Sequence, residues 1–123
     1  MVSERTLMLI HYLTGLGILV AGAVHIGTVF LTAPVKENLE FAGSPFAVMG
    51  VYRNAILAGS LEALLLFVAF HAFNGLRVIL IELYQSPRWE HAVTWALTVV
   101  ALLVVIYGTR TIIIAYSIAQ GVA

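Results

Sequence analysis

Three long apolar segments constrain what this chain can fold into more than any other feature of its sequence. They run from about residue 7 to 32, 55 to 84 and 92 to 118. A bilayer core is crossed by roughly 20 helical residues, so each segment is long enough to span a membrane. The chain is 62% hydrophobic and 10% charged, whereas soluble domains carry about 25% charged residues. We therefore predict an all-α membrane protein with three transmembrane helices.

Little of the chain remains outside these segments. The first connection mixes charged and aromatic residues between Pro34 and Arg53, which predicts a short element lying at the membrane interface. The second connection, QSPRWEH, is so short that the second and third helices must be antiparallel neighbours. The first apolar segment is too long for a cleaved signal peptide, so we expect it to stay as a membrane helix. We expect one domain, residues 1–123.

Composition also limits the chemistry that this chain can perform. It has no cysteine, which excludes disulfides, thiolate catalysis, iron–sulfur ligation and covalent haem attachment within the chain. The formal net charge is zero and no basic run exists, so nucleic acid is not an expected partner. Small residues in the first segment, such as Gly15 and Gly22, permit close helix contacts. Three helices enclose a large cofactor poorly, so a second membrane chain or a second copy is expected.

Polar residues in the middle segment are the main functional candidates. His71 lies within the apolar run and is followed by Gly75, Arg77 and Glu82. Such residues are costly in a bilayer unless each has a partner, so we treat them as functional by default. Imidazole is a usual axial ligand of haem iron. We predict that His71 binds haem iron and that Gly75 admits the haem edge. The alternatives are a hydrogen-bonding helix contact for His71 and helix packing for Gly75.

Two further histidines lie in the first segment. His11 and His25 are fourteen residues apart, which places them on a similar helix face but roughly 21 Å apart along the axis. They therefore cannot bind one iron, but they can serve sites at two depths. A hydrogen-bonding helix contact is the alternative for His25, and a satisfied interfacial residue is the alternative for His11. The propionates of a haem need cations, which Arg77, His11 and Arg110 could supply.

A polar pair is expected deeper in the second and third segments. Glu62 and Arg110 lie 22 and 18 residues from the facing ends of their segments, Tyr84 and Ala92. Because the chain reverses between the segments, we predict that Glu62 and Arg110 face one another or share a polar site. A purely structural ion pair would explain the same pattern.

Two short motifs resemble those of a known family. HAFNGLRVILIE, with His71, Gly75, Arg77 and Glu82, resembles the second-helix motif of the membrane anchor subunits of succinate dehydrogenase and fumarate reductase. His11, with Thr14 and Gly15, resembles the first-helix motif of the larger anchor. The resemblance covers almost the whole chain.

The resemblance implies a function, cofactors and partners. The chain would be an anchor, a cytochrome b, that performs no carbon chemistry and sits in the cytoplasmic (inner) membrane with its amino terminus in the cytoplasm. Its partners would be a flavoprotein subunit, an iron–sulfur subunit and a second membrane anchor. His71 would be an axial ligand of haem b, while His11, Glu82 and Tyr84 would lie near the site of membrane quinone.

Two-haem members of the family imply a further role for the first helix. By this resemblance His25 would be a metal ligand at a second, distal haem, with Arg110 and Glu62 near its propionates or near a distal quinone. Two alternatives to the whole interpretation remain: an anchor without cofactor, and a small transporter subunit in which Glu62, Arg110 and His71 relay protons.

Overall fold

Long helices make up most of the part of the chain that the structure describes. The computed structural model describes residues 2–31 and 49–121. The helices in this part of the chain are α1 (Glu4–Leu31), the short α3 (Met49–Arg53), α4 (Ala55–Leu83) and α5 (Pro87–Gly121). Of these, α1, α4 and α5 are long and apolar enough to cross a membrane. The predicted all-α architecture with three membrane helices is confirmed.

The residue immediately before each long helix caps that helix with its side chain. The Thr6 amide donates to Ser3 Oγ at 3.2 Å, and the Ile56 amide donates to Asn54 Oδ1 at 2.9 Å. At the third start the Trp89 amide donates to Ser86 Oγ at 3.2 Å. Such caps satisfy amides that have no partner within their own helix. They explain why α1 and α5 begin at Glu4 and Pro87, earlier than hydropathy alone suggested.

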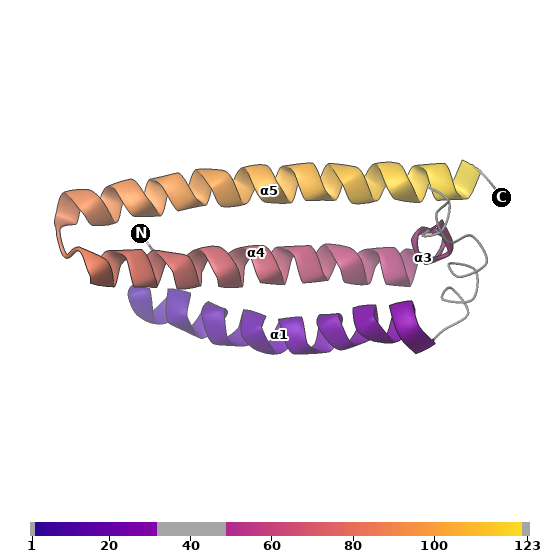
Figure 1. Cartoon of the computed structure of the whole chain (residues 1–123), viewed down its shortest axis with the longest axis horizontal. Helices are drawn as coiled ribbons and strands as arrows, with labels where there is room; N and C mark the ends of the chain where they lie inside the picture. Colours follow the sequence, from indigo (N-terminus) through magenta and orange to yellow (C-terminus); the bar gives the residue numbers. More distant parts are fainter. Residues whose placement is uncertain (1, 32–48, 122–123) are drawn as a thin grey trace.

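The middle helix of the sequence is also the middle helix in space. Figure 1 shows α4 lying between α1 and α5 and antiparallel to both, and α4 packs against each of them. The short α3 packs across the ends of α4 and α5, and Gln120 Nε2 donates to the Arg53 carbonyl oxygen at 3.0 Å. Met49 and Arg53 bound the described part of the predicted interfacial element; residues 32–48 lie outside the described residues.

Within residues 2–31 and 49–121, nothing covers the outer faces of α1 and α5. Large apolar side chains such as Leu19 and Tyr107 are 70% exposed. In water such faces would be unstable, but lipid is as apolar as these side chains. The three long helices therefore form a layer with α4 in the middle. The outer faces of α1 and α5 suit lipid or another membrane chain.

Candidate functional site

Two imidazoles from different helices are stacked near the first half of α1. The rings of His11 on α1 and His71 on α4 lie 3.8 Å apart between centroids, at an interplanar angle of 12°. His71 Nδ1 lies 3.0 Å from the backbone carbonyl oxygen of His11. The tertiary structure thus joins the two histidines that the sequence places in separate motifs.

A glycine on the opposite helix makes room for each imidazole. A Cβ on Gly15 would lie 3.0 Å from His71 Cε1, and a Cβ on Gly75 would lie 3.4 Å from His11 Cε1. Each glycine follows a histidine by four residues, so the arrangement is reciprocal: His11 lies over Gly75 and His71 lies over Gly15. The sequence predicted that Gly75 would admit a haem edge, and in this structure the group that lies next to Gly75 is the His11 ring.

The hydrogen bond to the His11 carbonyl fixes the proton on His71. A carbonyl oxygen only accepts, so His71 Nδ1 must carry the hydrogen and donate it. In the neutral ring this leaves Nε2 with its lone pair, which is the form that binds a metal. Stacking covers one face of the ring, whereas that lone pair lies in the ring plane. The contact with His11 therefore orients His71 without blocking its ligating atom.

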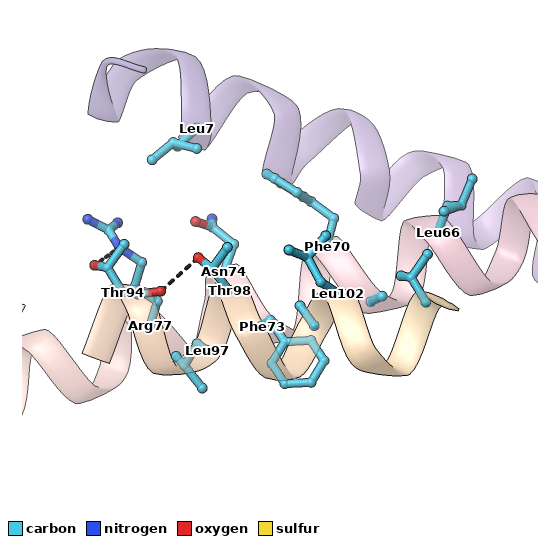
Figure 2. Close-up of a pocket in the computed structure, with 13 residues that line it drawn as sticks. Leu7, Leu66, Phe70, Phe73, Asn74, Arg77, Thr94, Leu97, Thr98 and Leu102 are labelled. Carbon is cyan, nitrogen blue, oxygen red and sulfur yellow. Dashed lines mark hydrogen bonds between the residues drawn. The ribbon is translucent and has the colours of Figure 1, made fainter. Parts of the chain in front are cut away.

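Arg77 joins all three long helices. Its guanidinium donates to the Glu4 carboxylate of α1 at 3.1 and 2.8 Å. On α5 it donates to Thr94 Oγ1 at 2.9 Å, the contact dashed in Figure 2, and it lies 3.5 Å from Glu90 Oε1. The Arg77 side chain is only 11% exposed. Bidentate pairing of this kind is among the stronger polar contacts in proteins.

His25 and Arg110 lie elsewhere. His25 lines a separate hollow of about 410 Å³ together with Tyr52 and Leu64. It is half-buried and makes no hydrogen bond or ring contact with His71 or Arg110 within residues 2–31 and 49–121. Arg110 is exposed on α5. The structure therefore places His25 apart from the stacked pair, as its sequence spacing predicts.

Glu62 finds a different partner from the one expected. Its Oε1 accepts a hydrogen bond from Thr109 Oγ1 at 2.6 Å, and the described helices contain no ion pair between Glu62 and Arg110. The predicted match in depth is correct, because Thr109 adjoins Arg110 in the chain. The facing residue differs because one step along a helix rotates the side chain by about 100°.

The proposed quinone residues are not assembled by this chain. Glu82 and Tyr84 are exposed at the end of α4, where Tyr84 makes an edge contact with Trp89. His11 lies at the level of His71. His71 precedes Glu82 by eleven residues on α4, which is roughly 16 Å along the helix. His11 and Glu82 therefore do not adjoin one another in the described helices.

The donor set suits haem better than a bare ion. No group of three or more His, Asp or Glu residues that could hold a metal occurs among the residues placed by the structure. Haem needs only axial ligands from protein. His71 fits that requirement, because its proton is fixed on Nδ1 and Gly15 leaves room for its ring.

A comparison with protein families identifies the chain's relatives. The family model described as succinate dehydrogenase/fumarate reductase transmembrane subunit matches residues 3–109. The chain belongs to this family. The membership agrees with the three membrane helices, so the protein is an integral membrane subunit. The resemblance inferred from the two histidine motifs is confirmed.

A curated relative supports the same assignment over part of the chain. Over 61 residues the chain is 36% identical to the succinate dehydrogenase 2 membrane subunit SdhC of Mycobacterium tuberculosis. The match covers 49% of this chain and 45% of that protein, so it spans about half the length of each. No solved structure matches the chain significantly.

Sequence reasoning missed three contributors to this region. Glu4 lay outside the predicted first helix, and Thr94 carries no motif, yet both bind Arg77. Asn74 lies next to Gly75 in the motif, but no role was assigned to it. The available signal was its polarity one helical turn after His71 within an apolar run.

Proposed function

We propose that this chain is a haem b-bearing, quinone-reactive membrane anchor of a succinate:quinone oxidoreductase or fumarate reductase. Succinate oxidation or fumarate reduction would take place on a flavoprotein partner, and electrons would pass through an iron–sulfur partner to membrane quinone. Family membership and the similarity to a succinate dehydrogenase membrane subunit support this assignment. The chain would sit in the cytoplasmic membrane with its amino terminus in the cytoplasm.

The observation that carries the haem assignment is the hydrogen bond from His71 Nδ1 to the His11 carbonyl oxygen. It leaves Nε2 free to ligate iron and fixes the ring orientation, as partners of metal-bound histidines usually do. His71 is half-buried rather than enclosed, so a second anchor subunit would complete the site. When bound, haem would supply one-electron transfer.

The residues around His71 would hold and shield such a group. Gly15 and Gly75 supply close approach between α1 and α4, and the stacked His11 ring keeps water away from one face of His71. Arg77, Arg110 and His11 remain the candidates for propionate neutralisation. For Arg77 this role would compete with Glu4 and Glu90, which already bind its guanidinium. His25 would serve a second haem at a different depth.

The two alternative functions gain little from the geometry. A proton relay needs neighbouring polar groups, yet Glu62, Arg110 and His71 share no hydrogen bond in the described helices. An anchor without cofactor would explain the stacked histidines as helix packing. That alternative is decided by experiment.

The decisive experiment is a reduced-minus-oxidised spectrum with pyridine haemochrome quantification on the detergent-purified complex. His71→Ala should remove at least one haem signal, because it removes the ligating nitrogen. His91→Ala, at an exposed position near the start of α5, is the matched control and should keep the full signal. Unchanged haem in assembled His71→Ala complex would disprove the assignment, and absence of haem from the parent complex would favour the cofactor-free anchor.

A further inference from the structure

An arginine on the outer face of α5 has no partner among the residues that the structure describes. Arg110 is exposed, and it makes no ion pair or hydrogen bond within residues 2–31 and 49–121. Glu62, at a similar height, accepts instead from Thr109 Oγ1 at 2.6 Å. One turn before Arg110, Tyr107 is 70% exposed, and its hydroxyl also has no hydrogen bond within the described residues. Residues three apart share a helix face, so two polar groups on one face are available to a ligand.

The position of Arg110 along α5 places it inside the hydrocarbon layer. It follows the midpoint of α5, Val104, by six residues, or roughly 9 Å. The neighbouring helix gives the same depth, because Glu62, which binds Thr109, precedes the midpoint of α4, Ala69, by seven residues, or roughly 10 Å. With these midpoints at the bilayer centre, Arg110 lies within a hydrocarbon boundary that is about 15 Å away from the centre. A charge at that depth is costly unless an anion pairs with it.

The side chains around Arg110 favour lipid over another helix as its neighbour. Close contacts between membrane helices use small residues. Between residues 101 and 119, every glycine and alanine of α5 is buried or half-buried, and a Cβ on Gly108 would lie 2.6 Å from Leu65 Cδ2 of α4. The exposed side chains in this stretch are mostly large and apolar, such as Leu103 and Ile106. The small residues of this half of α5 are therefore used inside the chain, and its outer face suits lipid.

We propose that Arg110 binds the phosphate of an anionic phospholipid in the leaflet on the α3 side of the membrane, with the Tyr107 hydroxyl donating to an ester carbonyl of the same lipid. A guanidinium donates two parallel hydrogen bonds to a phosphate, and the long arginine side chain can extend along the helix toward the boundary. Tyr107 lies three residues nearer the bilayer centre, or roughly 4.5 Å, and lipid ester groups lie on that side of the phosphate. A headgroup without a cation of its own, such as phosphatidylglycerol, leaves the arginine as its counterion.

This site is independent of the haem and quinone assignments. His25 lines a hollow to which α5 contributes Val104 and Ile112. Ile112 is two residues from Arg110, and two residues rotate a helix by about 200°. The hollow and Arg110 therefore lie on opposite sides of α5. The inference gives Arg110 a role other than neutralising a propionate at His25.

The test is photoaffinity labelling of the whole purified complex in phosphatidylcholine nanodiscs. The two probes are a phosphatidylglycerol and a phosphatidylcholine that carry the same diazirine in one acyl chain next to the ester, and labelled peptides are mapped by mass spectrometry. The phosphatidylglycerol probe should label the segment around Tyr107 and Arg110 about fivefold more than the phosphatidylcholine probe. This is the effect of one cation on an anionic lipid near a membrane surface.

Four variants separate the charge from the hydroxyl. Arg110→Gln should abolish the preference, so that both probes label the segment equally, and Arg110→Lys should keep most of it. Tyr107→Phe should lower labelling by both probes roughly fivefold, the effect of one hydrogen bond, and leave their ratio unchanged. Arg88→Gln, at an exposed position near the start of α5, is the matched control and should leave labelling around Arg110 unchanged. Native gels and haem spectra check the assembly of each variant.

Three outcomes would overturn the proposal. Equal labelling by the two probes in the parent complex would show that Arg110 does not select an anionic lipid. No lipid labelling around Arg110, with labelling elsewhere on α5, would show that another subunit covers this face. Loss of haem from assembled Arg110→Gln complex, with the lipid preference unchanged, would assign Arg110 to a propionate. If Arg110→Gln fails to assemble, the parent comparison and Arg110→Lys still decide the question.

Discussion

At the scale of single residues, the site depends on two glycines as much as on two histidines. His71 can reach the His11 carbonyl only because Gly15 presents no side chain to it. Gly75 follows His71 by four residues, as Gly15 follows His11, and it leaves room for the His11 ring. A glycine here serves close approach between helices, which is a common use of small residues in membranes.

The first prediction compares two glycines of α1. Gly15→Ala places a Cβ 3.0 Å from His71 Cε1, whereas a Cβ on Gly22 meets nothing within 4 Å. Gly15→Ala should displace the His71 ring and weaken its bond to the His11 carbonyl. A less basic ligand stabilises ferric iron less, so the haem midpoint potential should rise. Gly22→Ala should leave the potential unchanged.

Redox titration of the two purified complexes measures this effect. Equal potentials in Gly15→Ala and Gly22→Ala complexes with full haem content would contradict the inference that Gly15, by having no side chain, positions the His71 ring. A loss of haem in Gly15→Ala alone would agree with it, because the ring would no longer face the iron position.

At the scale of helices, Arg77 connects elements that hydropathy treats as independent. α1 and α5 each pack on α4, and the guanidinium of Arg77 reaches a carboxylate on both of them. Glu4 is 65% exposed and Glu90 is 51% exposed, and each lies in the first turn of its helix. There solvent weakens each pair, although Arg77 itself is largely buried.

The second prediction is a graded loss of stability. Arg77→Leu should lower the free energy of unfolding by roughly 1–3 kcal/mol, because it removes charged hydrogen bonds to two helices. Glu4→Gln should cost about 1 kcal/mol or less, since Glu90 and Thr94 still bind the guanidinium. Glu82→Gln, at an exposed position, is the control. Thermal melts by circular dichroism in detergent should rank the variants in this order. A larger loss of stability in Glu82→Gln than in Arg77→Leu would contradict the stabilising role of the Arg77 contacts.

At the scale of the whole molecule, the candidate ligands occupy two depths. His11 marks the level of His71 through the stacked rings, and His25 lies fourteen residues along α1, or roughly 21 Å away. His25 lines a hollow that His71 does not share. Exposed apolar faces on α1 and α5 leave room for a second membrane chain to supply opposite ligands.

The third prediction concerns that second depth. His25→Ala should remove one of two haem signals and keep the one that depends on His71, because the two sites are too far apart to share an iron. Electron paramagnetic resonance of the oxidised complex separates two low-spin haems. If the parent complex contains one haem, His25 is not a haem ligand and serves helix packing.

Much of the architecture followed from local sequence properties. Hydropathy over windows of bilayer length predicted α1, α4 and α5, and the helix starts at Ser3, Asn54 and Ser86 obey capping chemistry that is readable in the sequence. The motif around His71 predicted the family, which the comparison confirmed. The depths of Glu62 and Arg110 were predictable because helical rise is constant.

Facing relations were decided by the tertiary structure. Sequence spacing gives the height of a side chain on its helix, whereas the partner depends on which faces of two helices meet. For that reason Glu62 binds Thr109 instead of Arg110, and Arg77 binds Glu4 and Thr94. The bond from His71 to a backbone carbonyl leaves no trace in sequence, because every residue has a carbonyl. Packing alone determined that His11 supplies it and that Asn74 is left without a partner within the described helices.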